Sequence, residues 1–230
     1  MSDPLSPQLT PPQWVAFASF AVALVVVGTR LGWRISRHAI TVAHEGGHAA
    51  VALLSGRRLS GVRLHSDSSG LTLSSGRPRG PGMIATLGAG YVTPSLLGLG
   101  AAWLVATRHV SAMLVIVLVL LVALLFAVRN AFGVCLVLVC GAGVFIAAFH
   151  GSPTVRGFVA WAITWGLLLG GGRPVWEAAR SPRRRPGVAS DADQLAALTH
   201  VPGVMWLGLF GLVAAGSLIV GGRWLLISVR

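Results

Sequence analysis

Charged residues are scarce in this chain of 230 residues, and lysine is absent. Only 10% of the residues are charged, whereas a soluble domain of this size carries about a quarter. Apolar residues make up 54% of the sequence, and their runs are too long and too numerous for one soluble core. The shortage of charge therefore excludes an ordinary soluble domain and predicts a multi-pass helical membrane protein.

Acidic residues are rarer still, with six against eighteen arginines, which gives a formal net charge of +12. A chain this basic suggests nucleic-acid binding, but most of it is expected to lie in lipid. Loops on the cytoplasmic side of a membrane protein carry an excess of arginine, and the anionic lipids of that side attract them. We therefore expect the lipid bilayer as a partner and no nucleic acid.

Cysteine and N-terminal basic residues are also scarce. The two cysteines, Cys135 and Cys140, lie in one apolar run and off one another's helical face. They are expected to be small buried apolar residues rather than a disulfide or a metal pair. Residues 1–13 contain no basic residue, so they are expected to form a polar tail without the basic region of a secretory signal.

The apolar runs predict a single domain over residues 1–230, an all-α membrane bundle of about seven transmembrane helices. The expected spans are residues 14–28, 39–54, 83–106, 110–128, 131–149, 155–169 and 204–227. Arginine counts on the two sides favour a cytoplasmic N-terminus, which puts the first and last ends of the bundle on opposite sides. Two polar loops, at 56–81 and 170–203, are separated by an even number of spans and so fall on one side.

These two loops have different patterns. Residues 62–65 and 71–74 alternate apolar and polar side chains around a polar turn, which predicts a short β-hairpin-like loop, with a plain connecting loop as the alternative. The second loop contains a basic linker at 180–186 and then Ser190 and Asp193, whose spacing resembles a helix start. That second loop is the part of the chain richest in acidic residues.

The most informative stretch lies in the second span, where His-Glu-Gly-Gly-His occupies residues 44–48. On a helix, His44 and His48 share one face and can bind one zinc ion. Glu45 can reach a water molecule beside the metal and remove its proton. Packing histidines with a hydrogen-bonded glutamate are the alternative, but such groups in hydrocarbon need partners. A bound divalent cation would compensate the cost of burying these groups, so the metal-binding interpretation is favoured over simple packing.

The third span begins with small residues that recur every four positions. These are Gly82, Thr86 and Gly90, and such a stripe lets two membrane helices approach closely. The helix that carries residues 44–48 is itself rich in glycine and alanine. We therefore expect the two helices to pack together.

A catalytic zinc ion usually has three protein ligands, so one more is required. Asp191 and Asp193 precede the last span, on the same side of the membrane as the hairpin loop. From the residues alone, either aspartate could be the third zinc ligand. The alternatives are that both cap a helix or that His200 is the ligand.

Three stretches, taken in order, resemble a known family. Residues 43–49, 88–92 and 190–192 are similar to stretches of the site-2 protease family of intramembrane zinc metallopeptidases, in its small bacterial branch without inserted domains. The resemblance extends from about residue 40 to residue 206, and only its HExxH stretch is highly specific.

The resemblance implies a cofactor and a set of site residues. The cofactor is Zn²⁺, with Glu45 as the catalytic base and a third ligand that in the family is often an aspartate followed by glycine. This chain has no Asp-Gly pair, so the match relies on order along the chain and on the Ser-Asp-Ala context. The implied ligands are His44, His48 and Asp191, with Asp193 as the alternative.

The sequence thus predicts an intramembrane zinc metalloendopeptidase that hydrolyses membrane-embedded protein substrates with a zinc-activated water, as in regulated intramembrane proteolysis. Its expected location is the cell membrane, as a multi-pass protein of the bacterial plasma membrane. The hairpin is expected to hold an extended substrate by strand addition. The alternative is a non-catalytic protein that binds or transports metal, although the spans carry few of the polar groups that an ion path needs.

Overall fold

The computed structural model describes residue 8, residues 12–180 and residues 189–228. Most of the tail expected at residues 1–13, and the basic segment after Arg180, lie outside the described residues. The elements in chain order are α1 (Gln13–Gly28), α2 (Arg30–Leu54), β1 (Arg58–Leu64), β2 (Gly70–Ser75), α3 (Pro81–Ala106), α4 (Val110–Ala127), α5 (Ala131–His150), α6 (Pro153–Gly170), α7 (Arg173–Arg180), α8 (Asp191–Thr199) and α9 (Gly203–Ser228).

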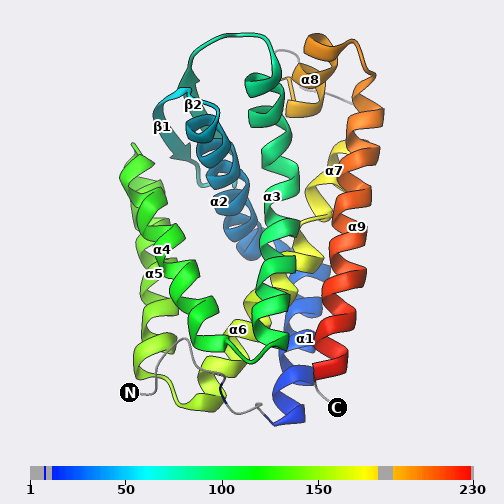
Figure 1. The fold of residues 1–230 in the computed structure, drawn as a ribbon. Helices are drawn as coiled ribbons and strands as arrows, with labels where there is room; N and C mark the ends of the chain where they lie inside the picture. Colours follow the sequence, from blue (N-terminus) through cyan, green and yellow to red (C-terminus); the bar gives the residue numbers. More distant parts are fainter. Residues whose placement is uncertain (1–7, 9–11, 181–188, 229–230) are drawn as a thin grey trace.

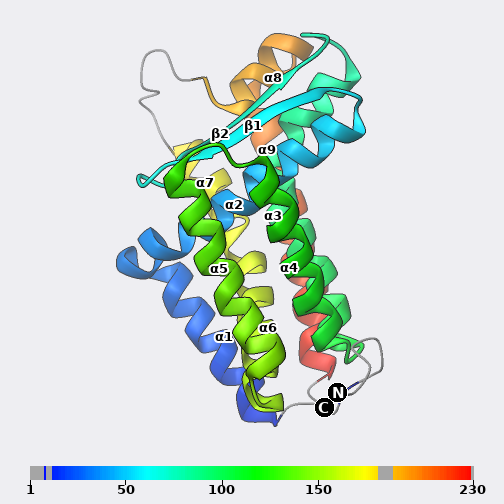
Figure 2. The same cartoon turned by 90° about the vertical axis from the view of Figure 1, so that its left-hand side faces the viewer.

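The predicted all-α membrane bundle with a short hairpin is confirmed. Each expected span falls on a helix to within a residue at either end or lies inside a longer one. The hairpin and α8 lie together at one end of the bundle in both views (Figures 1 and 2). The two polar loops therefore share one side, as the even number of intervening spans predicted.

Helices α1 and α2 together account for the difference in the number of spans. Among the described residues, five helices are long and apolar enough to cross a membrane alone, and α1 and α2, bent by 98° at their junction, pass the same test only when taken together as one span. The bend occurs because Thr29 caps a new helix, its side chain accepting a hydrogen bond from the Gly32 N–H at 3.2 Å. The start of α1 and the end of α9 consequently lie at the same end of the bundle (Figures 1 and 2). Their expected placement on opposite sides is therefore wrong.

Small residues bring α2 and α3 into close contact. A Cβ atom on Gly47 would collide with the Thr93 side chain, and one on Gly82 would meet the Ser55 Cβ at 3.2 Å. The contact at Gly47 requires glycine, because a larger side chain would separate the two helix backbones, and the contact at Gly82 is tight. The expected packing of the third span against the HExxH helix is confirmed.

The hairpin has the expected antiparallel pairing. Leu64 lies opposite Gly70 and Arg58 opposite Ser75, with an irregularity between Leu59 and Gly61. The alternating burial along β2 places every second side chain toward the protein and leaves the others exposed. The hairpin follows directly from α2, so it lies beside the helix that carries both histidines.

The connection between α4 and α5 pairs with the far side of β1. The Arg129 N–H donates to the Val62 carbonyl at 2.9 Å. The Asn130 side chain accepts from the Leu64 N–H at 3.1 Å and donates to the Leu64 carbonyl at 2.7 Å. Strand β1 is therefore paired on both sides, and among the described residues the outer edge of β2 has no strand partner.

The polar stretch at 170–203 is more ordered than a plain linker, because it contains α7 and α8. Helix α8 starts with the predicted signature, a reciprocal pair in which Ser190 and Asp193 each bind the other's backbone N–H. Helix α7 was not predicted; its eight residues follow α6 after a break of two residues. An ion pair between Arg173 and Glu177 at 3.4 Å supports it.

Helices α4 and α5 expose apolar side chains on their outer faces, as contact with lipid requires. Val119 and Val139 are 62% and 65% exposed. Both cysteines are free, so the expectation of no disulfide holds. Cys135 is exposed rather than buried, because it points to this outer face of α5.

We expect Asn130→Ala to lower the thermal unfolding midpoint of the detergent-purified protein. Leu64 is fully buried, and a buried backbone group left without its partner costs about 1–3 kcal/mol. For a chain of this length each kcal/mol lowers the midpoint by about 2–4 °C. Val119→Ala, on the outer face of α4, is the control; equal midpoints in the two variants would contradict the anchoring role of Asn130.

Candidate metal centre

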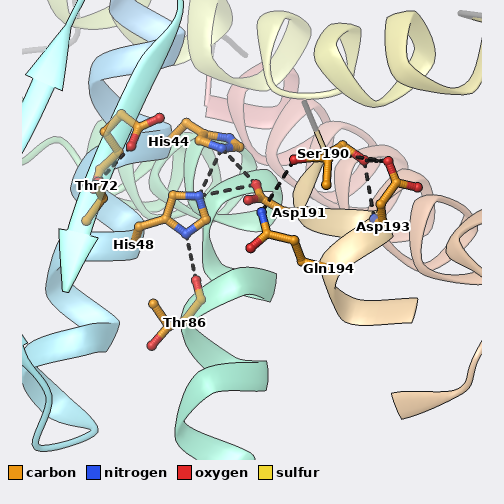
Figure 3. Close-up of polar contacts among 10 residues, drawn as sticks. His44, His48, Thr72, Thr86, Ser190, Asp191, Asp193 and Gln194 are labelled. Atoms are coloured by element: carbon orange, nitrogen blue, oxygen red, sulfur yellow. Dashed lines mark hydrogen bonds and ion pairs between the residues drawn. The ribbon is translucent and has the colours of Figure 1, made fainter. Parts of the chain in front are cut away.

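Three side chains from two distant parts of the chain converge at the end of the bundle that carries the hairpin. His44 and His48 lie one turn apart on α2, and Asp191 is the first residue of α8 (Figure 3). The Asp191 Oδ2 atom is 3.1 Å from His44 Nε2 and 3.2 Å from His48 Nε2, and the two Nε2 atoms are 3.1 Å apart. The three potential ligand atoms thus form a nearly equilateral triangle.

This triangle fits a tetrahedral metal ion. Zinc bonds of about 2.0–2.1 Å to nitrogen and oxygen place neighbouring ligand atoms about 3.3 Å apart. Two imidazoles with one carboxylate are also a known donor set of catalytic zinc, in which the fourth position stays open. Among the described residues, no other group of three His, Cys, Asp or Glu side chains has such an arrangement.

The three side chains of the cluster are largely buried but remain partly exposed to solvent. The side chains of His44, His48 and Asp191 are 19%, 9% and 17% exposed. Burial alone raises the pKa of the Asp191 carboxyl, but the hydrogen bonds and charges of the two imidazoles outweigh it and hold that pKa well below its usual range. The carboxyl group is therefore ionised, as a metal ligand must be.

Helix α3 sets the orientation of His48. The His48 Nδ1 atom is 2.6 Å from the Thr86 carbonyl oxygen, and a carbonyl can only accept. A proton is therefore assigned to Nδ1, so that loss of the Nε2 proton on metal binding would leave the Nε2 lone pair directed at the cluster. Thr86 belongs to the small-residue stripe, but no pattern in the sequence predicts that its backbone carbonyl contacts a candidate ligand.

Two further residues of α3 shape the space around the imidazoles. A Cβ atom on Gly90 would meet the Nε2 atoms of both His44 and His48, so only glycine leaves room at the donor atoms. The Tyr91 ring lies edge-on to His44, with 5.1 Å between ring centroids, and stacks on Phe210 of α9 at 5.2 Å. Tyr91 thus packs against His44, a contact that no sequence pattern predicts.

Glu45 lies on the hairpin side of α2 and is 5% exposed. Its Oε2 atom accepts a hydrogen bond from the Thr72 hydroxyl of β2 at 2.6 Å. Figure 3 shows Thr72 on one side of the imidazole pair and Asp191 on the other. The contact of Thr72 with Glu45 was not predicted, and its only signal in the sequence was the inward position of Thr72 in the alternating pattern of the strand.

The remaining candidate ligands lie outside the triangle. Asp193 accepts hydrogen bonds from the Ser190 hydroxyl at 2.8 Å and the Ser190 N–H at 3.1 Å, and so caps α8. His200 is the residue at which α8 ends, in a left-handed conformation. The geometry favours Asp191 over both, and its role as a ligand stays a prediction.

Comparison with known proteins gives one family match. The model of the family described as Peptidase M50B-like matches residues 17–221. No curated protein matches the chain, and no solved structure does. The matched range includes α2, the hairpin, α3 and α8, and therefore every residue of the candidate metal centre.

We expect Asp191→Ala and Asp193→Ala to differ in bound metal. Loss of Asp191 removes a ligand and should weaken zinc binding by more than about 100-fold, since loss of an outer partner alone costs about 10–100-fold. Loss of Asp193 removes the hydrogen bonds with Ser190 at the start of α8 and should leave the zinc content unchanged, because Asp193 is outside the triangle. Elemental analysis of the purified proteins measures both, and normal zinc in Asp191→Ala would move the third ligand elsewhere.

Proposed function

The chain belongs to the Peptidase M50B-like family, and from this premise we propose that it is an intramembrane zinc metalloendopeptidase. The observation that carries the proposal is the triangle of His44, His48 and Asp191, with Glu45 next to the first histidine in a membrane helix. The family match supports a membrane metallopeptidase, and the site supports hydrolysis of a peptide bond.

The proposed roles follow from the chemistry of each group. His44, His48 and Asp191 would hold the metal. A zinc ion there would supply Lewis-acid chemistry, making a water molecule acidic near neutral pH and polarising the carbonyl of the peptide bond. Glu45 accepts the proton of the attacking water and then delivers it to the amine nitrogen as the C–N bond breaks. The reaction consumes one water molecule, whose hydroxyl group adds to the carbonyl carbon and whose proton goes to the amine nitrogen.

The outer edge of β2 is the proposed binding place of the substrate. Leu71 and Leu73 on this strand are 48% and 41% exposed, and they alternate with the inward Thr72. A substrate segment that leaves its helical conformation can add to this edge by main-chain hydrogen bonds. We therefore propose membrane-embedded proteins as substrates and the cell membrane as the place of action.

Metal transport or simple metal binding is the other function that the sequence allowed. An ion path through a bundle needs a series of polar or ionisable groups. Among the described residues, the buried polar side chains away from the centre are hydroxyls. Ser19 and Thr164 bind carbonyl groups of their own helices, which supports a closed bundle and favours the peptidase.

Glu45→Gln should reduce proteolysis by about 10²–10⁴-fold, because the amide cannot accept the proton of the water. The measurement is cleavage of fluorescent casein and of a reporter with one membrane span by the protein reconstituted in vesicles. Zinc content should be unchanged, since Glu45 is not a ligand.

Glu177→Gln is the matched control, because Glu177 is the only other glutamate of the chain. Its carboxylate pairs with Arg173 at 3.4 Å and Arg37 at 3.9 Å, away from the histidines. This variant should keep its activity. Full activity in Glu45→Gln would overturn the proposed mechanism.

A further inference from the structure

Strand β2 contacts the proposed general base directly. The Thr72 hydroxyl lies 2.6 Å from Glu45 Oε2 and 3.2 Å from the Glu45 carbonyl oxygen. A hydroxyl has one proton to donate, and the shorter distance assigns it to the carboxylate. The partner of Glu45 is thus 27 residues further along the chain, on the strand proposed to bind substrate.

The backbone of the same strand closes in on the carboxylate. A Cβ atom on Gly70 would lie 2.5 Å from both Glu45 Cγ and Glu45 Oε1. Gly70 therefore allows the strand to approach, and Thr72 supplies a hydrogen bond two residues later, on the same face of the strand. Together they leave the Glu45 side chain little freedom.

We propose that Thr72 is a positioning residue that holds the Glu45 carboxylate, so that the strand that binds substrate also aligns the general base. This inference rests on the proposed function. A substrate added to the outer edge of β2 fixes the backbone of the strand and with it the hydroxyl of Thr72. The base is then held in place when a peptide bond is present.

The physical reason is the precision that proton transfer requires. A glutamate side chain has three rotatable bonds, and a misplacement of about 1 Å costs as much as 10²-fold in rate. The Thr72 hydroxyl occupies Oε2 and leaves lone pairs on Oε1 for the proton of the water. The hydroxyl itself touches no substrate, so its effect acts through Glu45.

The chain offers a matched control in Thr41. Its hydroxyl donates to the Ser68 carbonyl at 2.9 Å, so it also joins α2 to the hairpin. Thr41 lies one turn before Glu45 on α2, and its hydroxyl donates to Ser68 rather than to the Glu45 carboxylate. Thr41→Val therefore removes a similar hydrogen bond between the same two elements and keeps the one from Thr72 to Glu45.

The experiment compares kcat and KM of four reconstituted proteins with fluorescent casein as the probe. We expect Thr72→Val to lower kcat by about 10–100-fold, with KM and zinc content unchanged. Thr72→Ser keeps the hydroxyl and should restore most of the lost rate. Thr41→Val should have the kcat of the unchanged protein.

Two results would overturn this inference. One is a normal kcat in Thr72→Val while Glu45→Gln is inactive. The other is an equal loss in Thr72→Val and Thr41→Val, which would show that only attachment of the hairpin matters. Failure of the proposed function can be told apart from both results, because it would appear as full activity in the Glu45→Gln variant.

Discussion

The structure depends on the convergence of two imidazoles and one carboxylate within 3.2 Å of one another. In a membrane bundle such groups are costly unless a cation or hydrogen bonds compensate them. The surrounding elements make this convergence possible. Helix α3 approaches closely because Gly90 has no side chain, and its Thr86 carbonyl fixes the His48 ring. The small-residue stripe is therefore part of the candidate centre as well as a packing surface.

The centre is built from two sides. Helix α8 brings Asp191 from beyond the bundle, and the hairpin brings Thr72 to Glu45. Strand β1 is paired on both edges, partly through Asn130, so the hairpin is a fixed part of the fold. This arrangement puts the proposed ligands, the proposed base and the free edge of β2 at one end of the molecule, where a substrate and water can meet.

The membrane spans and two of the candidate ligands were predictable because the sequence patterns that indicate them are local. Hydropathy located the spans, and the four-residue spacing of His44 and His48 gave two candidate ligands. The choice between Asp191 and Asp193 was not local. It follows from the first turn of α8, where Asp193 is used by Ser190 and Asp191 is left to face the imidazoles. The end of the first helix at Gly28 was predicted, but its combination with α2 in one bent span was missed because hydropathy does not report the angle between helices. The partner of Glu45 was missed because strand register is a long-range property.

The central claim is that one metal ion is held by two imidazoles and one carboxylate. X-ray absorption at the zinc edge of the purified, metal-loaded protein tests it most directly. The account predicts one zinc per chain, nitrogen and oxygen ligands at about 2.0–2.1 Å and the scattering pattern of two imidazoles. Absence of stoichiometric metal, or a sulfur ligand at about 2.3 Å, would contradict it.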